Sequence, residues 1–156
     1  VYAAGDVAEV RDFVSGEPVI HAIWPTAVDQ GRAAGANMAG KNIPYPGSLG
    51  MNVVALFGVT LAEIGRFREA KGDSVEISGS SEGSHYRKVV VDPKGVMVGA
   101  MFLGDENGVS EMGVIHHAIK RRESWQGFVA RGARPTASYA AMFARVPPAL
   151  PKSAKA

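Results

Sequence analysis

Two short segments of this 156-residue chain place polar groups where they could bind a ligand. Gly5 and Asp6 follow an apolar run, and a tight glycine turn would let the Asp6 carboxylate accept hydrogen bonds from ligand hydroxyls. Pro25 suits the first turn of a helix, where the amides of Thr26 and Ala27 would be free donors beside a partial positive charge. Together these residues indicate a site for a ligand with hydroxyl groups and an edge that gains negative charge.

The elements that would hold these residues are a strand and a helix. Residues 1–6 are typical of the end of a buried strand that runs into a loop, and the helix is predicted from Pro25 to about Met38. Gly31 and Gly35 lie inside this helix, where each costs up to about 1 kcal/mol relative to alanine, so we expect another backbone to approach closely there. A strand buried on both faces needs neighbours on either side. We therefore expect the chain to be a C-terminal piece of a longer protein.

From about residue 51 the pattern changes to strands. The expected strands cover residues 52–57, 59–65, 74–78, 85–91 and 96–104. Between the last two, Asp92-Pro93-Lys94-Gly95 predicts a tight turn and therefore an antiparallel hairpin. Residues 108–122 predict an amphipathic helix with Met112, Ile115 and Ile119 on one side.

The sequence therefore predicts an α+β fold in three parts. Residues 1–43 would be a remnant of one domain, and residues 48–130 would form an antiparallel sheet packed against helices. Residues 131–156 are rich in proline and alanine, and we expect a basic, partly disordered tail.

Composition excludes several classes of function. With no cysteine, the chain forms no disulfide and offers no thiol nucleophile or Cys-ligated metal. The formal net charge of +2 arises from five basic residues and no acid in residues 131–156. No cluster of basic and aromatic residues indicates a nucleic-acid surface. No apolar run reaches the roughly 18 residues of a membrane helix.

Other residues with chemical potential have ordinary structural interpretations. His116 and His117 are adjacent and would point about 100° apart on a helix, so we expect no metal site. His21 and His85 are isolated in the sequence and are interpreted as surface or packing residues. Trp24 would either stack near a ligand or serve as a core or interface aromatic. The glycine- and serine-rich residues 78–84 lack the lysine and following helix of a phosphate loop, and are interpreted as a hairpin loop.

Residues 1–6, Val-Tyr-Ala-Ala-Gly-Asp, followed by Trp-Pro-Thr-Ala-Val-Asp-Gln-Gly-Arg-Ala-Ala-Gly at residues 24–35, resemble a known motif. It is the second flavin-contacting motif of the FAD-dependent pyridine nucleotide-disulfide oxidoreductases. The closest branch is the rubredoxin reductase, NADH oxidase and nitrite reductase large-subunit group. Residues 86–91 and 98–105 are similar to the C-terminal interface domain of that family. The resemblance covers about residues 1–122.

The resemblance assigns roles to the residues of the two segments. It implies that Asp6, in its turn with Gly5, binds the ribityl chain of FAD. It also implies that the helix end at Pro25, Thr26 and Ala27 faces the pyrimidine edge of the flavin, where it would stabilise the reduced, anionic form. No catalytic residue and no metal ligand is expected within this chain.

The sequence contains no G-x-G-x-x-G motif, so neither the FAD pyrophosphate motif nor the NAD motif is present. The resemblance implies that a parent protein passes a hydride from NAD(P)H to FAD and electrons on to an unknown acceptor. It also implies a homodimer in the cytoplasm, with this chain inactive in isolation. The alternative is a non-catalytic α+β module for partner binding or dimerisation, and composition does not separate the two.

Overall fold

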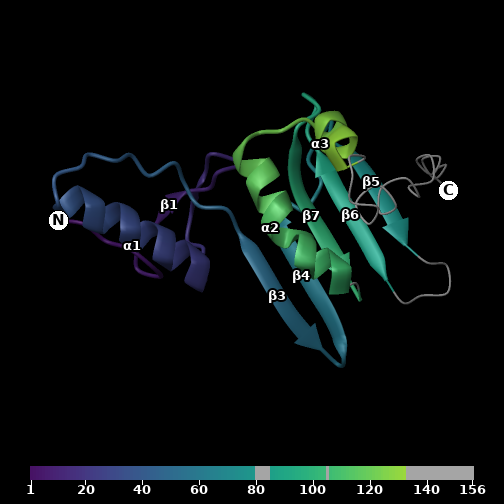
Figure 1. Cartoon of the computed structure of the whole chain (residues 1–156), viewed down its shortest axis with the longest axis horizontal. Coiled ribbons are helices and arrows are strands. Elements are labelled where there is room, and N and C mark those ends of the chain that lie inside the picture. Colours follow the sequence, from purple (N-terminus) through teal and green to yellow (C-terminus); the bar gives the residue numbers. More distant parts are fainter. Residues whose placement is uncertain (80–84, 105, 133–156) are drawn as a thin grey trace.

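The structure is a computed structural model that describes residues 1–79, 85–104 and 106–132. Figure 1 shows helix α1 at one end of the molecule and a sheet with two helices at the other. The elements are β1 (Val10–Arg11), β2 (Pro18–Val19), α1 (Trp24–Met38), β3 (Met51–Leu56), β4 (Val59–Gly65), β5 (Ser74–Gly79), β6 (Tyr86–Val91), β7 (Met97–Leu103), α2 (Glu106–Lys120) and α3 (Trp125–Gly132).

The larger sheet has five antiparallel strands in the order β3-β4-β7-β6-β5. The turn between β6 and β7 is the expected one: Asp92 Oδ1 accepts from the amides of Lys94 and Val96 at 2.9 Å each, and Gly95 has a φ of +79°. These bonds fix the register of the hairpin locally. The predicted α+β fold, an antiparallel sheet with packed helices, is confirmed.

The core lies between the sheet and helix α2, which packs on β4 and β7. Met112, Ile115 and Ile119 are each less than 5% exposed, so the predicted apolar side of this helix is confirmed. Phe128 of α3 closes the same core, where its ring stacks on Trp125 with centroids 5.9 Å apart. The five-stranded sheet together with α2 and α3, called the sheet domain below, thus has one continuous apolar core.

The opposite face of the sheet is also largely apolar. Ala62 and Phe102 belong to the core, so the neighbouring side chains of Leu61 and Leu103 lie on the other face. Apolar side chains on that face with 41% to 51% exposure are Leu56, Val59, Ile77 and Leu103. A solvated sheet face is normally polar. This outer face is therefore typical of a surface that something else covers.

The connection between β4 and β5 crosses one end of the outer face. Any side chain at Gly99 would overlap the backbone of Arg66, so only glycine lets the connection pass so closely. Arg66 pairs with the buried Asp73, and Lys88 Nζ lies 2.9 Å from Glu69 Oε1. This connection and its ion pairs therefore cover one end of the face, whereas no other described segment covers the opposite end, called the open end below.

Some expectations differ from the structure. Residues 1–4 form no strand and Val1 is fully exposed, because an extended segment becomes a strand only when another strand pairs with it. The strands β1 and β2 and the helix α3 were not predicted. The expected loop at residues 80–84 and the expected tail from residue 133 lie outside the described residues. Within the described part, no helix is long and apolar enough to span a membrane.

Candidate functional site

The Gly5–Asp6 turn lies against the first turns of helix α1. The amide of Ala8 donates to the Gly5 carbonyl at 2.9 Å, and Gly5 has a φ of +82°, so the turn requires the conformational freedom of glycine. A Cβ placed on Gly5 would be 3.7 Å from the Cβ of Ala27. Asp6 is exposed, and no described residue donates a hydrogen bond to its carboxylate. The structure thus brings together the two segments that the sequence singled out.

The N-terminal end of α1 begins one residue earlier than predicted. Trp24 is its first residue, and Ile23 has an extended backbone whose carbonyl accepts from the Ala27 amide at 3.1 Å. The expectation of a free amide at Ala27 is therefore wrong. The amide of Thr26 has no hydrogen-bond partner in the described part of the chain, and the residue is only 5% exposed. Of the two donors expected from the sequence, Thr26 is therefore the one left for a ligand within the described part of the chain.

Gln30 holds the turn in place. Its Oε1 accepts from the Gly5 amide at 2.7 Å, and its polar side chain also acts on the hydroxyl of Tyr45. Burial raises the pKa of Tyr45, the nearby Asp29 carboxylate adds to this rise, and the polar Gln30 side chain opposes it. Sequence reasoning missed Gln30 and Tyr45. The available signal was the spacing of Thr26 and Gln30, which puts two polar side chains on one face of a helix of small residues.

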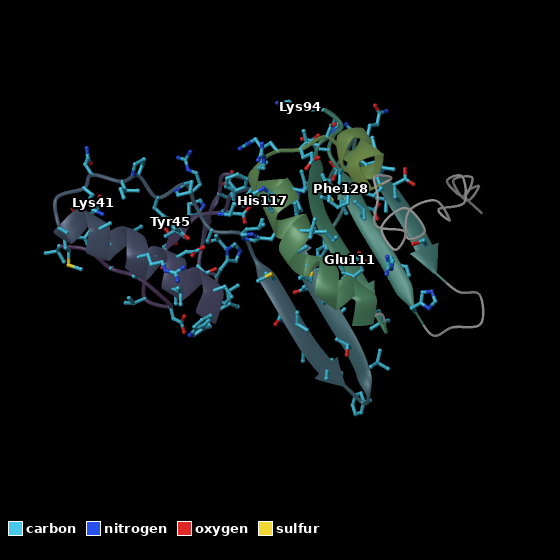
Figure 2. All side chains as sticks on the ribbon, viewed as in Figure 1. Lys41, Tyr45, Lys94, Glu111, His117 and Phe128 are labelled. Carbon is cyan, nitrogen blue, oxygen red and sulfur yellow. The ribbon has the colours of Figure 1, made fainter. Side chains whose placement is uncertain are left out.

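The C-terminal end of α2 contacts the segments that connect α1 with the five-stranded sheet. Lys120 Nζ donates to the Gly47 carbonyl at 3.0 Å and lies 4.8 Å from the centroid of the Phe13 ring. Burial lowers the pKa of Lys120, and the carboxylates of Asp29 and Asp12 oppose that effect. Burial also lowers the pKa of His116, and the charge of Lys120 lowers it further. Figure 2 places Tyr45 beside α1 and His117 on α2, on either side of this junction.

The remaining candidates occupy different environments. Trp24 is 78% exposed, so it is not a core aromatic within the described part of the chain. His21 is not isolated, since its Nδ1 lies 2.7 Å from Ser48 Oγ. His116 is half-buried and His117 exposed, and the described ranges bring together no group of three His, Cys, Asp or Glu residues suited to a metal ion.

Comparison with known proteins gives relatives of one kind. No family model matches the sequence. The NAD(P)H coenzyme A polysulfide/persulfide reductase of Pyrococcus horikoshii is 42% identical over 65 residues, which are 42% of this chain and 15% of that protein. The NADH-dependent phenylglyoxylate dehydrogenase subunit epsilon of Aromatoleum evansii is 32% identical over 127 residues, which are 78% of this chain and 28% of that protein.

A solved structure agrees with these relatives. The FAD-dependent pyridine nucleotide-disulphide oxidoreductase of Desulfovibrio vulgaris superposes with a TM-score of 0.67, covers 83% of this chain and 34% of its own, and is 20% identical. At that identity the likeness concerns the fold.

The sequence relatives named above are NAD(P)H- or NADH-dependent oxidoreductases. The chain is homologous to a part of these relatives, and its fold is that of the FAD-dependent pyridine nucleotide-disulfide oxidoreductases, the family that the motifs indicated. It spans less than a third of the curated relatives named above.

Proposed function

We propose that this chain forms one edge of the flavin site of an NAD(P)H-dependent FAD oxidoreductase. The observation that supports this is the Gly5–Asp6 turn, which Gln30 holds against the uncapped N-terminal end of α1. The parent protein would take a hydride from NAD(P)H and pass electrons to an acceptor that we leave open. By the same resemblance we place it in the cytoplasm.

The residues at this edge fit FAD chemically. The Asp6 carboxylate, exposed and without a described donor, accepts a hydrogen bond from a ribityl hydroxyl. The unpaired Thr26 amide donates to the pyrimidine edge of the flavin. Gly5, Pro25 and Ala27 border the ring system with little side-chain bulk, and Pro25 adds no donor of its own. Bound FAD would supply the capacity to accept a hydride and to release electrons singly or in pairs.

The helix end contributes a field as well as a donor. The aligned peptide dipoles of α1 place a partial positive charge at Trp24–Thr26, which favours nearby negative charge by about 0.3–1 kcal/mol, and more where water is excluded. Reduction places negative charge on the flavin ring. The chain therefore favours the reduced, anionic form without supplying a catalytic side chain.

Asp6→Ala in the full-length protein tests this proposal. Charge-assisted hydrogen bonds contribute about 1.5–3 kcal/mol, so FAD affinity should fall roughly 10- to 150-fold in a fluorescence titration. Glu9→Ala is the matched control, because Glu9 is an exposed acid three positions along the chain. Equal affinities for the parent and Asp6→Ala would contradict the assignment. A full-length protein that binds no FAD would favour the alternative, a non-catalytic module.

We also propose that residues 48–130 form a homodimer contact through the open end of the outer face. The half-exposed apolar side chains on that face support this part of the proposal. Leu56→Lys should shift the protein toward monomer in size-exclusion chromatography with light scattering. Val53→Lys is the control, because Val53 is similarly exposed on the same strand but lies on the α2 side of the sheet. Identical masses for the parent and both variants would contradict the contact.

A further inference from the structure

Three side chains outside the flavin edge meet where the α1 part joins the sheet domain. His21 Nδ1 lies 2.7 Å from Ser48 Oγ, and His21 Nε2 lies 3.6 Å from Asp12 Oδ2. Ser48 is 1% exposed, and His21 and Asp12 are largely buried at the side-chain level. We propose that Asp12, His21 and Ser48 form a joint that fixes the N-terminal end of α1 relative to the sheet domain, with His21 as its positioning residue.

The same residue types form the catalytic triad of serine hydrolases, but this cluster cannot work as one. A nucleophilic hydroxyl must be reached by its substrate, and Ser48 is almost fully buried. Its backbone is also fully engaged, since its amide donates to the Arg11 carbonyl at 3.0 Å and its carbonyl accepts from Phe13 at 2.8 Å. The cluster therefore holds two segments together.

The two outer members of the joint are also held by contacts that do not involve His21. The other carboxylate oxygen of Asp12 accepts from the amides of Val14 and Ser15 at 3.0 and 2.7 Å. Ser48 is fixed by its backbone bridge to residues 11–13. A Cβ at Gly50 would lie 3.0 Å from His21 Nε2, so the glycine leaves the room that the imidazole needs. The positions of Asp12 and Ser48 around His21 therefore do not depend on His21 alone.

His21 is the anchor of the short connection between β2 and α1. It lies three residues before Trp24, and its carbonyl accepts from the amide of Ile23 at 2.9 Å. Its neighbour Ile20 is 53% exposed and Trp24 is 78% exposed, so neither side chain ties the start of the helix to the sheet domain. The bond to Ser48 spans 27 residues and supplies that tie.

The contact between His21 Nδ1 and Ser48 Oγ is compatible with either neutral tautomer of the ring. In one tautomer, Ser48 Oγ–H donates to Nδ1 while Nε2–H points toward Asp12. In the other, Nδ1–H donates to Ser48 Oγ. The link to Ser48 therefore forms whichever ring nitrogen carries the hydrogen.

Spin labels can test the joint without any flavin. Since the chain has no cysteine, Arg32→Cys on exposed α1 and Lys94→Cys on the β6–β7 turn would give one defined label pair. The inter-label distance distribution should show one narrow peak that is lost in His21→Ala. His21→Asn should keep the peak, because its side-chain amide reaches the position of Nδ1. His117→Ala, which removes an exposed histidine of α2, should also keep it.

Ser48→Ala removes the same hydrogen bond from the other side, because it leaves His21 and Asp12 intact. This variant should also lose the narrow peak. If every folded variant keeps the narrow peak, the joint is overturned. The role toward the flavin rests on the proposed function and has its own measurement: FAD affinity of the full-length protein should fall about five-fold in His21→Ala and recover in His21→Asn. A full-length protein without FAD would overturn the proposed function but leave the joint standing.

Discussion

The hydrogen bond from Gly5 to Gln30 supports the candidate site, and its removal has a predictable cost. Gln30→Met keeps the approximate length and volume of the side chain but removes both polar groups. The Gly5 amide would lose its acceptor 2.7 Å away. Leaving a buried donor unsatisfied costs about 1–3 kcal/mol. Because Gly5 is only half-buried, we expect the unfolding free energy to fall by about 1–2 kcal/mol.

Urea denaturation of the 156-residue chain measures this change. The matched control is Gln126→Met, because Gln126 is an exposed glutamine on α3 and its loss should cost less than about 0.5 kcal/mol. Hydrogen exchange adds a local readout, since the Gly5 amide should lose its protection only in Gln30→Met. Equal unfolding free energies for the two variants, with Gly5 still protected, would refute the idea that Gln30 holds the turn.

Three further predictions concern the sheet domain. Gly99→Ala should lower the unfolding free energy by about 4 kcal/mol or more in urea denaturation, because the added Cβ overlaps the Arg66 backbone, whereas Gly113→Ala, exposed on α2 with open space around it, should raise it by about 0.5–1 kcal/mol. The hydrogen bond from Arg66 lowers the pKa of Asp73 in the folded protein. The ionised Asp73 therefore stabilises the fold fully above the unfolded pKa near 4, and this stabilisation is lost as pH falls through the lower folded pKa. The difference between the thermal midpoints of the parent and Asp73→Asn should accordingly shrink as pH falls below about 4. Deletion of residues 1–43 should leave a cooperative thermal transition at a lower midpoint, because Phe13 and Val14 pack on the core from outside it; loss of cooperativity would contradict the division into two parts.

Local signals in the sequence were enough for much of the sheet domain. The Asp92–Gly95 turn and the apolar side of α2 each act within a few residues, so their patterns predict structure directly. Helix α3 was missed because eight residues with two glycines give a weak helical pattern, and its burial depends on Phe128 meeting the core. The strand expected at Val1 was wrong because pairing depends on partners far along the chain or outside it.

The same division applies to the candidate site. Turn chemistry at Gly5 and Asp6 and the proline near the start of α1 were visible in the sequence. The exact first residue of the helix was not, and a shift of one position was enough to pair the Ala27 amide with Ile23. The clamp between Gly5 and Gln30 spans 25 residues, and the bond between His21 and Ser48 spans 27. Contacts at such separations leave no local pattern.

The position of the joint has a mechanical consequence for α1. The helix of 15 residues is about 22 Å long, and His21 lies just before its first residue, Trp24. A rotation of about 10° at this pivot would carry the far end at Met38 through about 4 Å but would leave the first turn nearly stationary. The fixed point therefore lies beside the N-terminal end of α1, which must stay aligned with the ligand. Any change in the angle of the helix displaces mainly its C-terminal end, which carries no candidate ligand-binding residue.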